Sequence, residues 1–283
     1  MRILRPEDDG YPAALRRLKR APRALHVDGS LEGLERAVGI VGTRRATPRA
    51  LDLARRLGRD LASAGVLVVS GGAEGIDRAA HEGALEAPGG RTIAVLPTAL
   101  ASPYPRAHAA LFERIASRGA RLTEHVSARV VRPAHFLERN RVIAALSRVV
   151  VVVQAPVRSG ALRTALDARC LAIPVLAVPW SPDEPAAAGS LALLAEGAGL
   201  CRDAADVLAA LGERARPSPP PPLGPGALDP DAQAIWALLD DTASDRESVV
   251  VRSGLAVGRA QAALVQLVMA GVVHEDARGV RRR

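Results

Sequence analysis

The stretch VVSGGAEGIDRAAHEGAL, residues 68–85, decides the fold of this chain. A short β-branched run leads into Ser70, Gly71 and Gly72, and a helical pattern begins near Gly75. A buried strand that turns through glycines into a helix is the repeating unit of an α/β fold. The loop matches neither GxGxxG nor GxxxxGK[ST], but its small residues would let an anion approach the backbone. We therefore predict that Ser70, Gly71 and Gly72 contribute to an anion-binding site.

The same unit recurs along the first three quarters of the chain. Apolar runs occupy residues 38–41, 66–69, 92–96, 121–123, 149–153 and 174–178, and helical patterns occupy residues 48–63, 76–85, 107–118, 136–146 and 161–170. Continuous β-branched runs indicate strands that are buried on both faces. We predict a Rossmann-like, doubly wound, mostly parallel sheet.

A proline-dense segment, ARPSPPPPLGPG at residues 215–226, has no apolar periodicity and predicts an extended linker. It separates a domain of residues 1–214 from one of residues 227–283. The second domain shows helical patterns at 231–239, 248–253 and 255–270, with Leu264, Leu267 and Val268 on one face. Residues 272–283 can form a wing that turns at Ala277, Arg278 and Gly279. This order predicts a winged helix.

Positive charge is concentrated in the first domain. The whole chain carries a formal charge of +8, and Lys19 is its only lysine. From Ala227 onward there are seven arginines and eight acidic residues, so the rest of the chain has 31 basic and 22 acidic residues, or +9. A polyanion is therefore expected to bind the first domain.

The composition also limits the class of protein. The first twelve residues, MRILRPEDDGYP, have acids where a signal peptide would be apolar, and the longest apolar run is too short to cross a membrane. Cys170 and Cys201 show no metal-ligand spacing. We expect a soluble cytoplasmic protein with no metal and no cofactor.

Two further loops are expected at the carboxyl edge of the sheet, where ligands bind in open α/β sheets. In VGTRRATP, residues 41–48, Gly42 permits a sharp turn, Thr43 can cap the next helix, and Arg44 can meet a phosphate. A capped turn with a solvated arginine explains this loop equally well. The second region consists of residues 135–147, with Arg139, Asn140 and Arg141, and residues 154–168, with a turn at Ser159 and Gly160. Several arginines along one edge fit backbone phosphates better than one small ligand.

Asp77 and His81 lie four residues apart on one helical face. That spacing suits a general acid–base pair, but capping and an internal hydrogen bond explain it as well, and the structural interpretation is favoured.

Read in order, these segments resemble the DprA/Smf family of DNA-processing proteins. The resemblance rests on spaced motifs over roughly residues 10–210: Gly42-Thr43-Arg44, SGGAEGIDRAAHEGAL, the run at 92–96, Tyr104-Pro105, the segment 119–124, and the segments 136–143 and 159–168. The resemblance implies a protein without catalytic residues that binds single-stranded DNA, forms a homodimer and loads the RecA recombinase during natural transformation. It implies that Arg44 is the central DNA contact, with Arg106, Arg139 and Arg141 as additional contacts.

The chain departs from the family pattern at four positions. Pro97 and Ala99 replace turn glycines, Gln154 replaces an acid, and Trp180 stands where a glycine usually follows Val-Pro. Pro97 removes one amide donor.

Two other functions remain open at this stage. A phosphoribohydrolase-like enzyme of the same Rossmann branch would need a catalytic acid, and Asp167 is the only substitute near the expected place. A winged-helix transcription factor would need a duplex-reading helix, but the second domain is slightly acidic. We expect a protein-contact or auxiliary role for that domain, because only Arg252, Arg259 and residues 281–283 are placed to meet phosphates.

Overall fold

The structure is a computed structural model, and it describes residues 1–125, 133–212, 229–240, 242–269, 272–276 and 279–282. Its internal contacts divide the chain into two units, Met1–Ala215 and Arg216–Arg283. Each unit has its own hydrophobic core. The predicted linker at residues 215–226 and the predicted domain limit at residue 214 lie outside the described residues.

The first unit is built on one mixed sheet with the order β1-β2-β6-β5-β4-β3-β7-β8-β9. Its strands are β1 Arg2–Leu4, β2 Leu25–Gly29, β3 Ala37–Val41, β4 Leu67–Ser70, β5 Thr92–Val95, β6 Ala120–Thr123, β7 Val149–Val152, β8 Val175–Ala177 and β9 Gly199–Leu200. The seven strands β3 to β9 run parallel to one another. β2 pairs antiparallel with β6, and β1 pairs antiparallel with β2.

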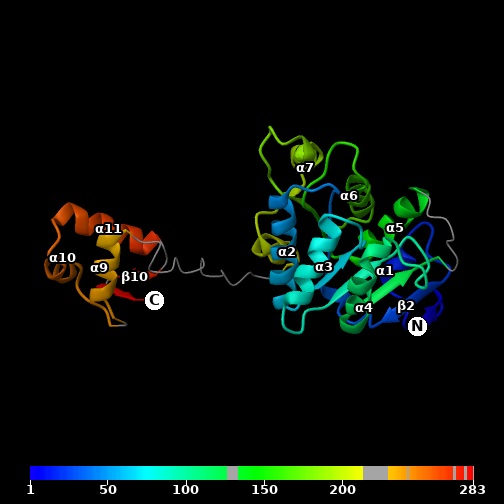
Figure 1. Cartoon of the computed structure of the whole chain (residues 1–283), viewed down its shortest axis with the longest axis horizontal. Helices are drawn as coiled ribbons and strands as arrows, with labels where there is room; N and C mark the ends of the chain where they lie inside the picture. The colour runs from blue at the N-terminus through cyan, green and yellow to red at the C-terminus, as the bar shows by residue number, and fades with distance from the viewer. Residues whose placement is uncertain (126–132, 213–228, 241, 270–271, 277–278, 283) are drawn as a thin grey trace. The chain divides into compact units, whose positions relative to one another are not determined.

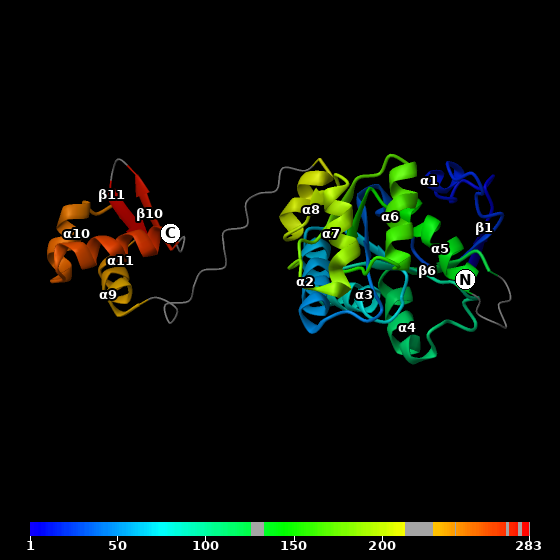
Figure 2. The ribbon, with the colours of Figure 1, turned by 90° about the horizontal axis from the view of Figure 1, so that it is seen from above.

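Helices cover both faces of this sheet (Figures 1 and 2). They are α1 Ala13–Arg16, α2 Pro48–Ser63, α3 Ile76–Glu86, α4 Ala109–Arg118, α5 Pro133–Leu146, α6 Gly160–Cys170, α7 Ala188–Ala195 and α8 Ala204–Ala210. Alternate residues of a strand point to opposite faces. Val38 and Ile40 of β3 accordingly pack with α2, α3 and α8, while Ala37 and Val41 pack in the core shared with α1, α5, α6 and α7.

The strand order reverses at β3. From β3 the chain moves outward through β4, β5 and β6, and it then returns to place β7 on the other side of β3. Such a reversal leaves a crevice at the carboxyl ends of the two central strands, because their connections leave to opposite faces. The loops after β3 and β7 therefore face each other.

The second unit has α9 Pro230–Leu238, α10 Arg246–Ser253, α11 Val257–Met269, β10 Val273–Asp276 and β11 Gly279–Arg282. The two strands pair antiparallel, and a bridge between Ser244 and Val280 adds a third short segment. Leu264 and Leu267 are buried as predicted, whereas Val268 is exposed. The predicted wing is present, and the residues 277–278 of its expected turn lie outside the described part.

No helix among the described residues is long and apolar enough to cross a membrane.

Candidate nucleic-acid interface

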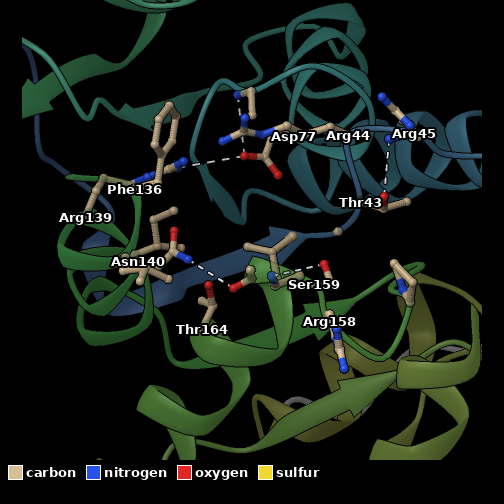
Figure 3. Close-up of a pocket in the computed structure, with 18 residues that line it drawn as sticks. Thr43, Arg44, Arg45, Asp77, Phe136, Arg139, Asn140, Arg158, Ser159 and Thr164 are labelled. Carbon is tan, nitrogen blue, oxygen red and sulfur yellow. Dashed lines mark hydrogen bonds and ion pairs between the residues drawn. The ribbon is translucent and has the colours of Figure 1, made fainter. Parts of the chain in front are cut away.

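A pocket of about 330 Å³ lies at the carboxyl ends of β3 and β7, where the strand order reverses. Its walls come from the loop after β3, the loop after β7, the helices α5 and α6, and the beginning of α3 with the loop before it. Seven residues predicted for the site line it: Gly42, Thr43, Arg44, Arg139, Asn140, Ser159 and Gly160. Figure 3 shows Phe136, Arg139 and Asn140 of α5 on one side and Thr43 and Arg45 on the opposite side.

Gly42 and Thr43 join the two loops to α3. A Cβ on Gly42 would lie 2.5 Å from Ile76 Cγ1 and 2.9 Å from the backbone oxygen of Gln154. A larger residue would therefore displace these neighbours. The Thr43 N–H donates to the Gln154 carbonyl at 2.7 Å, and the Ile76 N–H donates to the Thr43 carbonyl at 3.3 Å. The backbone that carries Arg44 is therefore fixed from both sides.

Arg44 is exposed at the mouth of the pocket. Its guanidinium carbon lies 4.3 Å from the centre of the Phe136 ring, within the range of a cation–π contact. The Tyr104 ring meets Phe136 edge-on with centroids 5.8 Å apart, and Tyr104 is 41% exposed. The Arg44 guanidinium, the Phe136 ring and the Tyr104 ring thus follow one another along the mouth of the pocket.

Arg139 lies in the pocket wall and is almost completely buried. Its Nη1 is 3.8 Å from Oδ2 of Asp77, which also accepts from the Ala73 N–H at 3.4 Å. Burial raises the pKa of Asp77 and lowers the pKa of Arg139, and the attraction between the two groups opposes both shifts. Nε and Nη1 of Arg139 have no hydrogen-bond partner among the described residues.

The periodicity of α5 separates two neighbouring arginines. Phe136, Arg139, Asn140 and Ile143 share one helical face and line the pocket. Arg141 lies on another face, where it pairs with Glu124 at 2.5 Å and donates to the Arg20 carbonyl at 2.7 Å. Arg141 therefore lies outside the pocket lining.

Arg106 is also absent from this lining. It is exposed in the short helix Arg106–His108, directly after Tyr104 and Pro105. Its contact with DNA stays a prediction, as does that of Arg141.

Ser70, Gly71 and Gly72 lie behind the residues that line the pocket. The Ser70 hydroxyl donates to the Ile40 carbonyl at 2.6 Å. A Cβ on Gly71 would overlap the Arg139 guanidinium, and a Cβ on Gly72 would lie 2.5 Å from Phe112. In the described structure these three residues seat Arg139 and the loop, and they do not line the pocket themselves.

Ser159 caps α6, since its Oγ accepts from the Ala161 N–H at 3.2 Å. Asn140 Nδ2 donates to the Gly160 carbonyl at 3.0 Å, which ties α5 to the start of α6. The N-terminus of α6, with its positive dipole end, thus borders the pocket.

Two lining arginines were missed by sequence reasoning. Arg45 follows Arg44 in the same loop, and Arg158 precedes the Ser159 cap; both are exposed. Each of them is the direct neighbour of a predicted site residue, and this position in the sequence could have indicated them. Four guanidiniums, those of Arg44, Arg45, Arg139 and Arg158, accompany one carboxylate among the described lining residues.

Asp77 and His81 have separate partners. His81 Nδ1 lies 2.7 Å from Thr92 Oγ1, which itself donates to the Val68 carbonyl. Burial lowers the pKa of His81 to about 3, so the ring is neutral at pH 7. His81 is not among the pocket-lining residues, which favours the structural interpretation of this pair.

Comparison with known proteins places this geometry in a family. A family model described as DNA recombination-mediator protein A matches residues 2–212, and a model described as DprA winged helix domain matches residues 214–277. The chain belongs to the DprA/Smf family of DNA recombination mediators. The predicted α/β fold with a C-terminal winged helix is thereby confirmed.

Individual relatives agree with this assignment. Protein Smf of Synechocystis is 33% identical over 311 residues, covering 97% of this chain and 78% of its own length. The X-ray structure of DNA processing protein A from Streptococcus pneumoniae superposes with a TM-score of 0.70 at 36% identity, covering 74% of this chain and 73% of that one. A Helicobacter pylori DNA processing protein A, solved to describe its single-stranded DNA binding mode, superposes with a TM-score of 0.66 at 32% identity, covering 74% and 95%.

Proposed function

We propose that this recombination mediator binds single-stranded DNA in the pocket between β3 and β7, without catalysing a reaction on it. The observation that carries the proposal is the set of four guanidiniums around a single, buried carboxylate at the topological switch point.

The strand would be held mainly through its phosphates. In the described part of the chain, the aromatic rings at the mouth of the pocket are those of Phe136 and Tyr104, so stacking contributes at one or two bases, at about 1–3 kcal/mol each. With three or four guanidiniums engaged, log affinity is expected to fall against log salt with a slope of about −2 to −3. Such binding tolerates any base sequence. The relative from Helicobacter pylori, whose structure describes single-stranded DNA binding, supports the same ligand class.

Replacing Arg44 tests this proposal. Arg44→Ala removes one charge-assisted contact, so we expect affinity for oligo-dT to fall about 10- to 100-fold and the salt slope to flatten by about 0.7. The measurement is fluorescence anisotropy of a labelled oligonucleotide over a salt series, with duplex DNA in parallel. Arg59→Ala is the matched control, because Arg59 is a half-exposed arginine of α2 outside the pocket lining. Equal affinities of Arg44→Ala and the parent protein would remove this pocket from the DNA path.

Among the described residues, neither acid considered for the hydrolase alternative is placed like a catalytic acid. Asp167 lies on α6 outside the pocket lining and is hydrogen-bonded to Arg163 at 3.1 Å. Asp77, the acid that does line the pocket, is buried against Arg139. Release of free base from nucleoside monophosphates would establish the alternative activity.

We further propose that the chain works as a homodimer and transfers its strand to a RecA-type recombinase, as membership in a recombination-mediator family supports. Light scattering after gel filtration tests the dimer. Faster assembly of RecA on oligo-dT in the presence of the protein tests the transfer.

A further inference from the structure

A second groove, of about 450 Å³, lies between α2 and the loop after β8. Arg49, Asp52 and Arg56 of α2 line one side, and Trp180 lines the other together with Arg202. None of its lining residues is shared with the pocket between β3 and β7. Nothing in the function proposed so far uses it.

The groove opens on the same edge of the sheet as the pocket. β8 runs parallel to β7, with Val152 level with Ala177, so Trp180 follows the carboxyl end of β8 just as the loop of Arg158 follows that of β7. The Trp180 indole N–H donates to the Val153 carbonyl at 2.6 Å, which fixes the ring at the start of that loop. On the other side, α2 begins at Pro48, four residues after Arg44.

The Trp180 ring is held but not covered. It is partly buried and packs at the edge of the core formed with α2 and α8. Its single polar side-chain atom is satisfied by Val153, and the ring lines the groove with its orientation fixed by that hydrogen bond. A flat ring that is already fixed loses little conformational entropy when a base stacks on it.

Two guanidiniums of the groove are free to meet an anion. Arg49 and Arg56 are exposed, and neither takes part in an ion pair or hydrogen bond within the described residues. They lie seven residues apart on one face of α2, roughly 10 Å along the helix. Arg202 is instead neutralised by Asp206 at 2.7 Å. Asp52 is the one acid in the described lining, so the unpaired guanidiniums outnumber it.

We propose that this groove binds a further stretch of the same DNA strand, with one base stacked on Trp180 and the neighbouring phosphates on Arg49 and Arg56. This inference rests on the proposed function, since the strand reaches the groove from the first pocket. An aromatic face flanked by unpaired guanidiniums is the combination by which proteins bind single strands irrespective of sequence. The second contact lengthens the footprint on each protomer.

The two tryptophans of the chain allow a direct test. Trp236 lies in the second unit under the Arg282 guanidinium, so Trp236→Phe leaves Trp180 as the only tryptophan reporter. We titrate this variant with dT6 and dT30 and record anisotropy of the labelled oligonucleotide together with tryptophan emission. The expected result is that dT30 quenches Trp180 with the same midpoint as the anisotropy change.

Affinity measurements form the second arm. Trp180→Leu is expected to weaken dT30 binding about tenfold, and Trp180→Phe to restore most of it. The double variant Arg49→Ala/Arg56→Ala is expected to flatten the salt slope for dT30 by about 1.4, whereas Arg59→Ala on the same helix leaves it unchanged. These two arginines are on the surface, so this arm remains informative even if the Trp180 variants fold poorly.

The outcomes separate the two proposals. If dT30 binds through Arg44 but Trp180 emission and the Arg49/Arg56 slope do not change, the second contact is disproved and the proposed function stands. If free dTMP quenches Trp180 while dT30 does not, the groove is a nucleotide site and the second contact is again disproved. If no oligonucleotide binds the parent protein, the proposed function itself fails.

Discussion

At Gly71, the lack of a side chain decides where a buried charge lies. The Arg139 guanidinium occupies the volume that a Cβ on Gly71 would need. We expect Gly71→Ala to cost about 1–3 kcal/mol of stability and to weaken oligo-dT binding, because the guanidinium must leave its place beside Asp77. Urea unfolding and anisotropy measure the two effects. Gly10→Ala is the control outside the pocket, since a Cβ there would meet only Leu4 Cδ2 at 3.5 Å.

A double variant isolates the cause. In an Arg139→Ala background the space is vacant, so Gly71→Ala should then cost little stability. Purely additive costs for Gly71→Ala and Arg139→Ala would mean that the glycine is needed for another reason.

The sequence predicted seven of the residues that line the pocket, but it did not predict the packing role of two glycines behind them. Gly71 and Gly72 make room for Arg139 and Phe112, and the approach of an anion to these glycines stays a prediction. The pattern around residue 71 carries no information about an α5 side chain 68 positions later. Only the packing of α5 against the sheet brings the two together.

At the scale of elements, α2 depends on a polar contact with the neighbouring loop. Thr47 Oγ1 caps the helix by accepting from the Ala50 N–H, and the buried Gln154 side chain donates to that oxygen at 3.1 Å. Gln154 Oε1 also accepts from the Thr47 N–H at 2.9 Å. The amide thus matches one donor and one acceptor, which gives a structural reason for the departure from the family acid at this position.

Removing that hydroxyl should loosen α2. Thr47→Ala removes the helix cap and leaves the buried side-chain N–H of Gln154 without its acceptor. We therefore expect a loss of about 2 kcal/mol or more in the free energy of unfolding. Thr47→Ser keeps the hydroxyl and should lose much less. Urea midpoints of the two variants make the comparison, and equal midpoints would show that the hydroxyl does not support the helix.

Elements that carry a clear apolar pattern of their own could be predicted from the sequence, and elements without one could not. The helix predicted at residues 48–63 coincides with α2, and the predicted parallel strands correspond to β3 through β8. The strands β1, β2 and β9 and the helices α1, α7 and α8 were missed. The strand β2 is fixed by antiparallel pairing to β6, about ninety positions away. Local periodicity cannot report such pairing.

At the scale of the whole molecule, the charge on the two units suggests a division of labour. Three of the described arginines of the winged helix are engaged within it: Arg259 binds Asp231 at 2.6 Å, Arg252 donates to the Leu238 carbonyl, and Arg282 lies over Trp236. The outer surface of α11 exposes Val257, Val265 and Val268. Valines offer no donor to base edges in a major groove. These features favour a protein contact over duplex reading.

Truncation tests this division. A variant that ends at residue 226 keeps the 31 basic and 22 acidic residues of the first part of the chain and every residue that lines the pocket. We expect its affinity for oligo-dT to stay within about threefold of the full chain, with an unchanged salt slope, because no phosphate contact is removed. Anisotropy titrations of both proteins at several salt concentrations decide the matter. A slope that becomes shallower by one or more would place phosphate contacts on the winged helix, and the strand would then have to bridge the two units.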